Sequence, residues 1–138
     1  MKRTSSSVVF FTVFFMANII YAAQDNWMRI ADEIEKALHD AVKSYEANKT
    51  GEAMEKVAEA YFGIFEGEKA NMEIAVRRFI SLKKAAELEK GFSDLRKAMF
   101  SKTPLSDIKK QTVALIEGVK ATAKELNRKG VGLGNFGF

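Results

Sequence analysis

The sequence predicts an all-α protein, an up-and-down bundle of four to five amphipathic helices that follows a cleaved signal peptide. Apolar residues recur at steps of three and four over most of the chain after residue 25, as they do in helices that bury one face. The same region lacks the strict apolar–polar alternation that indicates a half-buried strand. The first two dozen residues differ in composition from the rest. We therefore divide the chain into a signal peptide (1–22), a helical bundle domain (23–129) and a flexible Gly/Phe-rich tail (130–138).

The N-terminal segment has the order of a secretory signal peptide. Basic residues come first, an apolar run follows, and small residues end it: Lys2 and Arg3, then Val8 to Tyr21, then Ala22 and Ala23. We expect cleavage after Ala22 and a periplasmic location for the mature protein. A permanent membrane anchor is the alternative, but the run is shorter than the ~20 residues that a spanning helix needs. The mature form is thus expected to have no stable membrane span.

Composition and charge narrow the classes of function. Without Lys2 and Arg3 the chain carries 20 basic and 18 acidic residues, a net charge of +2, so nucleic-acid binding has little electrostatic support. A sequence without Cys has no disulfide and no Cys-x-x-Cys-His haem site, and we expect no haem. The bundle must therefore be held together by its apolar core.

Two helices are predicted in the first half of the bundle. Asp25 or Asn26 can cap the first, and the turn residues 48–51 end it. Its apolar stripe is Trp27, Ile30, Ile34, Leu38, Ala41, Val42 and Tyr45. Thr50 is expected to cap the second helix, whose stripe is Met54, Val57, Ala58, Tyr61 and Phe65. Gly67 then marks a kink or a short break.

Two further long helices and a shorter one are predicted in the second half of the bundle. Helical spacing resumes at Met72, Ala75, Val76 and Phe79. Ser81 is expected to cap the next helix, whose stripe is Leu82, Ala85, Leu88, Phe92, Leu95 and Met99. The last helix has the clearest start, because Thr103 can cap it and Pro104 suits its first turn. Short connections favour antiparallel neighbours. The tail from Gly130 to Phe138 has four glycines in nine residues and is expected to be mobile, with a partner-binding strand as the alternative.

The residues for enzymatic catalysis are largely missing. There is no Cys, His39 is the single His, and neither a Gly-x-Ser-x-Gly elbow nor a phosphate-binding Gly-rich loop is found. A hydrolase built on two carboxylates has no motif that singles out such a pair. We therefore expect that the protein is not an enzyme.

Acidic residues suggest a metal site instead. Four of them are spaced by seven residues, Glu52, Glu59, Glu66 and Glu73. If the helix continues through Gly67, they fall along one face, because seven residues come within ~20° of two full turns. Helical bundles bind iron and manganese with such inward-facing Glu side chains, often together with a His. The alternative is a solvated face with ordinary salt bridges.

The single histidine is a second candidate ligand. His39 lies one turn after Glu35 on the first predicted helix, and Asp32 shares their face. Such a pair can hold a metal ion, and it can equally be a hydrogen-bonded pair on the surface.

Four stretches follow one another along the chain: Tyr45–Gly51, Ala60–Glu66, Ser81–Phe92 and Leu95–Lys97. This succession resembles the extracytoplasmic helical domain that precedes the membrane part of bacterial high-affinity iron permeases of the Ftr type. In that family an Ala-Tyr-Phe…Phe-Glu helix is followed by a helix with Ser-x-Lys-Lys…Glu-x-Glu…Phe…Arg. The matching region runs from about Ile34 to Met99.

The resemblance implies a periplasmic domain that handles an iron ion beside a permease. The acids that match the family's pattern are Glu66, Glu87, Glu89 and Glu73, whereas Glu59 and His39 are candidates from their spacing alone. The permease's membrane spans and its Arg-Glu-x-x-Glu signature are missing from this sequence, so the chain cannot transport iron by itself. A separate membrane iron permease is the partner that we expect.

Two hypotheses from different classes follow. The first is a periplasmic bundle that binds or delivers a metal ion, iron above all, through these carboxylates. The second is a metal-free structural or adaptor bundle that docks a membrane or envelope partner. Its motivation is the Gly/Phe-rich tail and the basic stretch from Arg77 to Lys84.

Overall fold

The structure, a computed structural model, describes residues 26–134 and residue 136. The predicted signal peptide and its cleavage site lie outside these residues. Five α-helices and one π-helix occur in the described part of the chain, which contains no β-strand. They are α2 (Asn26–Glu46), α3 (Thr50–Ala58), the π-helix η1 (Glu59–Phe65), α4 (Met72–Phe79), α5 (Leu82–Phe100) and α6 (Leu105–Arg128). The prediction of an all-α bundle of four to five helices is confirmed.

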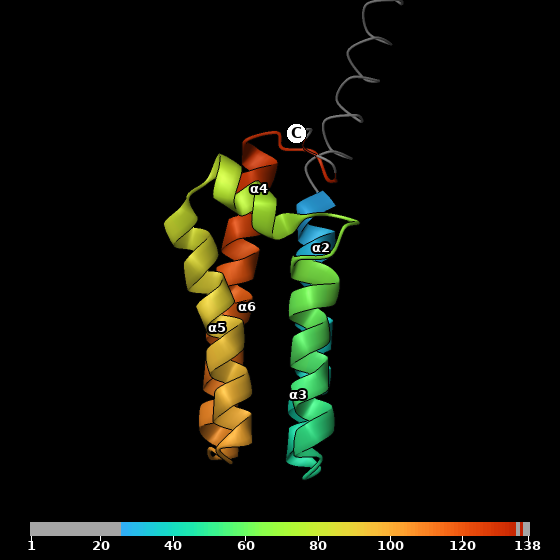
Figure 1. The fold of residues 1–138 in the computed structure, drawn as a ribbon, viewed down its shortest axis with the longest axis vertical. Helices are drawn as coiled ribbons and strands as arrows, with labels where there is room; N and C mark the ends of the chain where they lie inside the picture. Colours follow the sequence, from blue (N-terminus) through green and yellow to red (C-terminus); the bar gives the residue numbers. More distant parts are fainter. Residues whose placement is uncertain (1–25, 135, 137–138) are drawn as a thin grey trace, which may run out of the picture.

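Four long helical rods lie side by side and run alternately up and down (Figure 1). The rods are α2, α3 continued by η1, α5 and α6. The α2 helix packs against α3 and α6, and α5 packs against the same two helices, so each rod has two antiparallel neighbours. The short α4 lies at the end of the bundle where α2 begins and α6 ends. This end is the one at which the candidate site is assembled.

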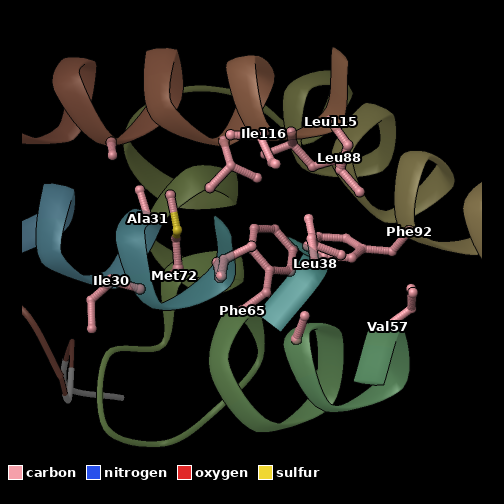
Figure 2. Packing of buried hydrophobic residues seen from close by; sticks show 14 of the residues in the cluster. Ile30, Ala31, Leu38, Val57, Phe65, Met72, Leu88, Phe92, Leu115 and Ile116 are labelled. Carbon is pink, nitrogen blue, oxygen red and sulfur yellow. The ribbon is translucent and has the colours of Figure 1, made fainter. Parts of the chain in front are cut away.

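The core of the bundle is formed by one apolar face from every helix, as Figure 2 shows. The largest side chains that are fully buried come from all six elements: Trp27, Phe65, Phe92, Ile34, Leu38, Met72, Leu95, Met99, Ile108, Leu126, Val57 and Val76. Nearly all of them belong to the predicted stripes. Burial of these side chains is the main force that holds together a small domain without disulfides.

The helix boundaries agree with the predicted signals in part. Ser81 is the N-cap of α5, and its hydroxyl accepts a hydrogen bond of 3.0 Å from the Lys84 amide. Thr50 does not cap α3, contrary to our prediction, because it is itself the first helical residue. At the start of α6, Pro104 occupies the cap position and its carbonyl accepts from the amides of Asp107 and Ile108. The predicted boundary was thus one residue early.

The chain does not remain helical through Gly67. Inside η1 the hydrogen bonds skip one residue more than in an α-helix, and the Glu66 amide donates to the Tyr61 carbonyl at 2.8 Å. The helix then ends, and a turn closes when the amide of Asn71 donates to the Gly67 carbonyl at 2.8 Å. The four Glu residues spaced by seven were expected to share one helix face only if the helix continued through Gly67. Since it does not, they do not form such a row.

The tail crosses the end of the bundle and packs on it. The Trp27 indole donates a hydrogen bond of 2.6 Å to the Val131 carbonyl, and the Phe136 ring stacks on Trp27 with centroids 6.5 Å apart. The Gly134 amide donates to the carbonyl of Ala70 at 3.2 Å. The described residues of the tail therefore have defined contacts, whereas its mobility in solution stays a prediction.

Within the part of the chain that the structure describes, no helix combines the length and the apolar character that crossing a bilayer requires.

Candidate functional site

Tyr61 lies at the centre of the candidate site. The π-helix turns its ring onto the core, where it meets Phe65 and Phe92 at centroid distances of 6.0 Å and 5.3 Å. Phe62 contacts the ring as well, in an edge-to-face arrangement with centroids 4.7 Å apart. The ring thus has three aromatic contacts, and its hydroxyl needs a polar partner.

The charges of three carboxylates act on this hydroxyl. Burial, a hydrogen bond to Glu66 and the negative charges of Glu66, Glu89 and Glu73 together raise the pKa of the Tyr61 phenol well above its usual value. The three acids come from three places, the end of η1, the start of α4 and the middle of α5. The π-helical spacing explains the first of them, because it returns the chain to Tyr61 after five residues.

Arg77 neutralises part of this charge. Its guanidinium donates to Glu73 in the same helix, α4, and to Glu89 in α5. These hydrogen bonds, that to Glu73 foremost, raise the pKa of the Arg77 guanidinium. The carboxylates are shielded from solvent in part, since the side chain of Glu73 is 18% exposed and that of Glu89 is 26% exposed. The four charged groups have a formal charge of −2, because three acids face one base. We call Tyr61, Glu66, Glu73, Arg77 and Glu89 the Tyr61 cluster.

Two of the predicted acids do not join the Tyr61 cluster. Glu87 is two residues from Glu89, so a helix turns it to a different face, where it pairs with Lys84 at 2.8 Å. This hydrogen bond lowers the pKa of the Glu87 carboxyl. Glu59 is exposed at the first residue of η1. Both acids have the surroundings of solvated helix residues.

His39 also lies apart from the Tyr61 cluster. Its Nε2 is 3.6 Å from a carboxylate oxygen of Glu35, as the one-turn spacing predicted. Glu35 is engaged on its other side by Lys120 of α6 at 2.5 Å, and this hydrogen bond is the largest cause of the lowered pKa of Glu35. The pair therefore belongs to the contact between α2 and α6, whereas the cluster lies on η1, α4 and α5.

Sequence reasoning missed two members of the cluster. Tyr61 was assigned to the apolar stripe, and Arg77 to an outward basic stretch. The signal for Tyr61 was its hydroxyl, which needs a polar partner when the ring is packed in a core. For Arg77 it was the Glu four residues before it, the helical ion-pair spacing. Neither signal identifies Glu89, which comes from another helix, as the shared partner.

The donor atoms of the cluster are all oxygens apart from the guanidinium. Carboxylates and a phenol are the ligands that hard cations prefer. In the conformation described, Arg77 holds Glu73 and Glu89, and no three His, Cys, Asp or Glu side chains of the described residues are arranged to hold a metal ion. Binding of a cation at this place therefore requires the guanidinium to move aside.

The basic stretch and the Gly/Phe-rich tail, which suggested an adaptor role, both make contacts within the bundle. Arg77 pairs with two acids, Arg78 donates to the Phe136 carbonyl at 2.6 Å, and Lys84 pairs with Glu87. The tail lies on the bundle end, as described above. The basic stretch is therefore only in part a surface for an anionic partner.

Comparisons of the chain with protein-family models, with curated proteins and with solved structures found no match. The likeness to the extracytoplasmic domain of iron permeases therefore stays a prediction from the motifs.

Proposed function

We propose that this protein is an exported helical bundle that binds a hard metal cation at the Tyr61 cluster and supplies it to a membrane permease. Ferric iron is the ion that we propose, because it favours phenolate and carboxylate oxygens. The observation that carries the proposal is the pairing of Glu73 from α4 and Glu89 from α5 with the one guanidinium of Arg77, near a phenol whose pKa these two acids and Glu66 raise. Sequence spacing alone brings no such set together.

Charge supports the same proposal. The cluster keeps a formal charge of −2 after Arg77 is counted, and partial burial weakens the screening of that charge by water. A bound cation would compete with the guanidinium for Glu73 and Glu89. The Arg77 side chain is 39% exposed, so it has room to turn outward when the ion enters.

The location of Tyr61 between core and carboxylates supports a role for the phenol. Its raised pKa disfavours the phenolate in the absence of a metal. A trivalent cation replaces the proton with a larger charge, so binding should release protons and depend on pH. Delivery to a permease rests on the motif resemblance and on the predicted signal peptide.

The proposal is tested by titrating the purified protein with ferric citrate, followed by calorimetry and visible absorption. The full chain is expressed, and mass spectrometry of the product shows whether residues 1–22 have been removed. We expect saturable binding of one ion and a visible phenolate-to-iron absorption band. Tyr61→Phe should abolish the band, and the double variant Glu66→Gln/Glu89→Gln should abolish binding.

Two further variants sharpen this test. Arg77→Gln removes the competing cation, so iron affinity should rise by about tenfold, the ratio that ~1.4 kcal/mol gives. Glu87→Gln lies on the same helix as Glu89 but outside the cluster, and it should bind iron as the wild type does. Equal affinity in the wild type and the Glu66/Glu89 variant, or binding of manganese in preference to iron, would refute this function.

A further inference from the structure

A groove of about 700 Å³ lies between the α3–η1 rod and α5. Its apolar lining consists of one thioether and four aromatic rings: Met54, Tyr61, Phe62, Phe92 and Phe100. Phe92 belongs to the core, but Phe62 is 59% exposed and Phe100 is 74% exposed. Large apolar side chains that remain exposed along one groove are typical of surfaces that bind another molecule.

The shape of the groove suits an α-helix. Its two walls are antiparallel helical rods that form one face of the bundle (Figure 1). The small side chains of Ala86 and Ser93 lie in the α5 wall and leave room for a third helix to approach. The described residues contain no β-strand whose edge a peptide could extend. Helix-in-groove binding is thus the recognition mode that fits.

The charges of the groove select among possible occupants. Three of its charged residues are already paired, Glu89 with Arg77 outside the groove, and Lys90 with Asp94 within it. Arg96 and Lys97 also line the groove, and neither has an ion-pair partner within the described part of the chain. Two unpaired positive charges therefore lie near Phe100 on α5, whereas the excess negative charge of the Tyr61 cluster lies farther along the groove, at Glu89.

We infer that this groove binds an amphipathic helix of a partner protein that presents apolar side chains at helical spacing and carboxylates to Arg96 and Lys97. A second copy of this chain fits less well, because a symmetric contact would bring the same two positive charges against each other. The apolar N-terminal segment from Val8 to Tyr21 fits less well too, since it contains no acid.

This inference goes beyond the metal function and is independent of it. The two sites share Tyr61 and Glu89, but Phe62, Phe100, Arg96 and Lys97 are outside the Tyr61 cluster. Variants at those four positions therefore test docking without altering a metal ligand.

The test is a selection from a displayed library of random helical peptides against the purified protein. We expect the enriched peptides to carry apolar residues at i, i+3 or i+4, and i+7, with an excess of Asp and Glu beside them. The variant Phe62→Ser/Phe100→Ser should bind a selected peptide about tenfold more weakly or worse, because each lost ring removes apolar burial. In the variant Arg96→Glu/Lys97→Glu, the preference should change to peptides with Lys in place of the acids.

Leu82→Ser and Val113→Ser are the matched controls, because these side chains are 67% and 50% exposed and lie outside the groove. They should bind the selected peptide as the wild type does, and circular dichroism should show all variants to be folded. A selection that enriches no peptide, or one without an acidic excess, overturns the inference. So does unchanged binding by the Phe62/Phe100 variant. Dimerisation that this variant abolishes would identify a second copy as the occupant instead.

Discussion

Glu52 and Glu66 belong to the same series of acids spaced by seven residues, yet their side chains meet different surroundings. The Glu52 carboxylate accepts from the Ser44 hydroxyl and the Lys56 ammonium, both at 2.8 Å. Glu66 accepts instead from the phenol of Tyr61, whose pKa is raised further by the negative charges of Glu89 and Glu73. A carboxylate beside an ammonium group is neutralised where it stands, whereas a group of acids with one shared base keeps excess negative charge. Of these two environments, the second is the one at which we propose that a further cation binds.

The surroundings of Glu52 predict a loss of stability in acid. The hydrogen bonds from Lys56 and Ser44 lower the pKa of its carboxyl from 4.5 to about 2. Because the folded pKa is the lower one, the stabilisation is complete above pH 4.5 and is lost as the pH falls to about 2. Glu52→Gln lacks it at every pH. The difference in melting temperature between wild type and Glu52→Gln should therefore be largest near neutral pH and should close in acid.

The control for this experiment is Glu55→Gln, on the same helix. Glu55 is exposed, and it has no ion pair among the residues that the structure describes. Its melting temperature should follow that of the wild type at each pH. A difference for Glu52→Gln that stays constant between pH 7 and pH 2 would show that the hydrogen bonds to Glu52 do not survive in solution.

At the scale of elements, the π-helix and the break after it assemble the Tyr61 cluster. A regular α-helix would place Glu66 about 140° around the axis from Tyr61. The wider π-helical turn brings residue 66 back over residue 61, and the break allows Glu73 to approach from α4. Single π-helical turns are often found at functional sites, because they realign side chains at a cost in regular hydrogen bonding.

Gly67 is required at this break. A Cβ atom at residue 67 would lie 2.2 Å from the carbonyl oxygen of Gly63, which is backbone and has no rotamer by which to move away. Gly67→Ala should therefore destabilise the fold by about 1–3 kcal/mol, the usual cost of forcing an extra methyl group into a packed place. Urea unfolding followed by circular dichroism measures this free energy.

Gly63 provides the matched control. A Cβ atom there meets the Glu59 side chain at 3.5 Å, an ordinary contact. Gly63→Ala should be neutral or stabilising by about 0.5–1 kcal/mol, because alanine restricts the unfolded chain more than glycine does. If both variants unfold at the same urea concentration as the wild type, the close approach of residues 63 and 67 is not present in solution.

The helical architecture could be predicted because a stripe such as Leu82 to Met99 repeats over several turns, and a single misplaced residue hardly changes it. The π-helix could not, because Ala-Tyr-Phe-Gly-Ile-Phe has the same apolar spacing whether the fourth or the fifth residue closes the turn. The predicted common face of the four acids spaced by seven was wrong for the same reason, since it requires regular α-helical turns at every residue between Glu59 and Glu73. The resemblance implied Glu66, Glu87, Glu89 and Glu73 as ligands, and Glu87 lies apart from the other three, paired with Lys84. Periodicity contains no information on contacts between helices.

At the scale of the whole molecule, the two ends of the described chain meet. Trp27, at the start of α2, is fully buried beneath the tail that follows α6. The amide of Trp27 also donates to the Asn127 side chain at 3.2 Å, so α6 supplies a cap for α2. The contacts join the first and last described elements, which lie side by side in the bundle. They close the end at which α4 and the Tyr61 cluster lie.

Removal of residues 131–138 should open this end. The deletion takes away the carbonyl of Val131, which accepts a hydrogen bond from the buried indole of Trp27. It also removes the Phe136 ring, which stacks on the indole of Trp27. An unsatisfied buried donor costs about 1–3 kcal/mol, so the melting temperature should fall by several degrees. Trp27 is the one tryptophan in the sequence, so its fluorescence reports this place alone. Its emission should shift to longer wavelength as water reaches the indole.

A shorter deletion separates the two contributions. Removal of residues 135–138 takes away the Phe136 ring but leaves the Val131 carbonyl in the chain. This variant should keep most of the stability and show a smaller shift in Trp27 emission than the longer deletion. The hydrogen bond, rather than the ring, is expected to dominate, because a missing acceptor leaves a buried N–H without a partner, whereas a missing ring leaves a surface that water can cover. If the melting temperature falls equally in the two variants, the stability of this end comes from Phe136 instead. If it falls in neither, the tail is mobile and its contacts contribute nothing to the stability of the fold.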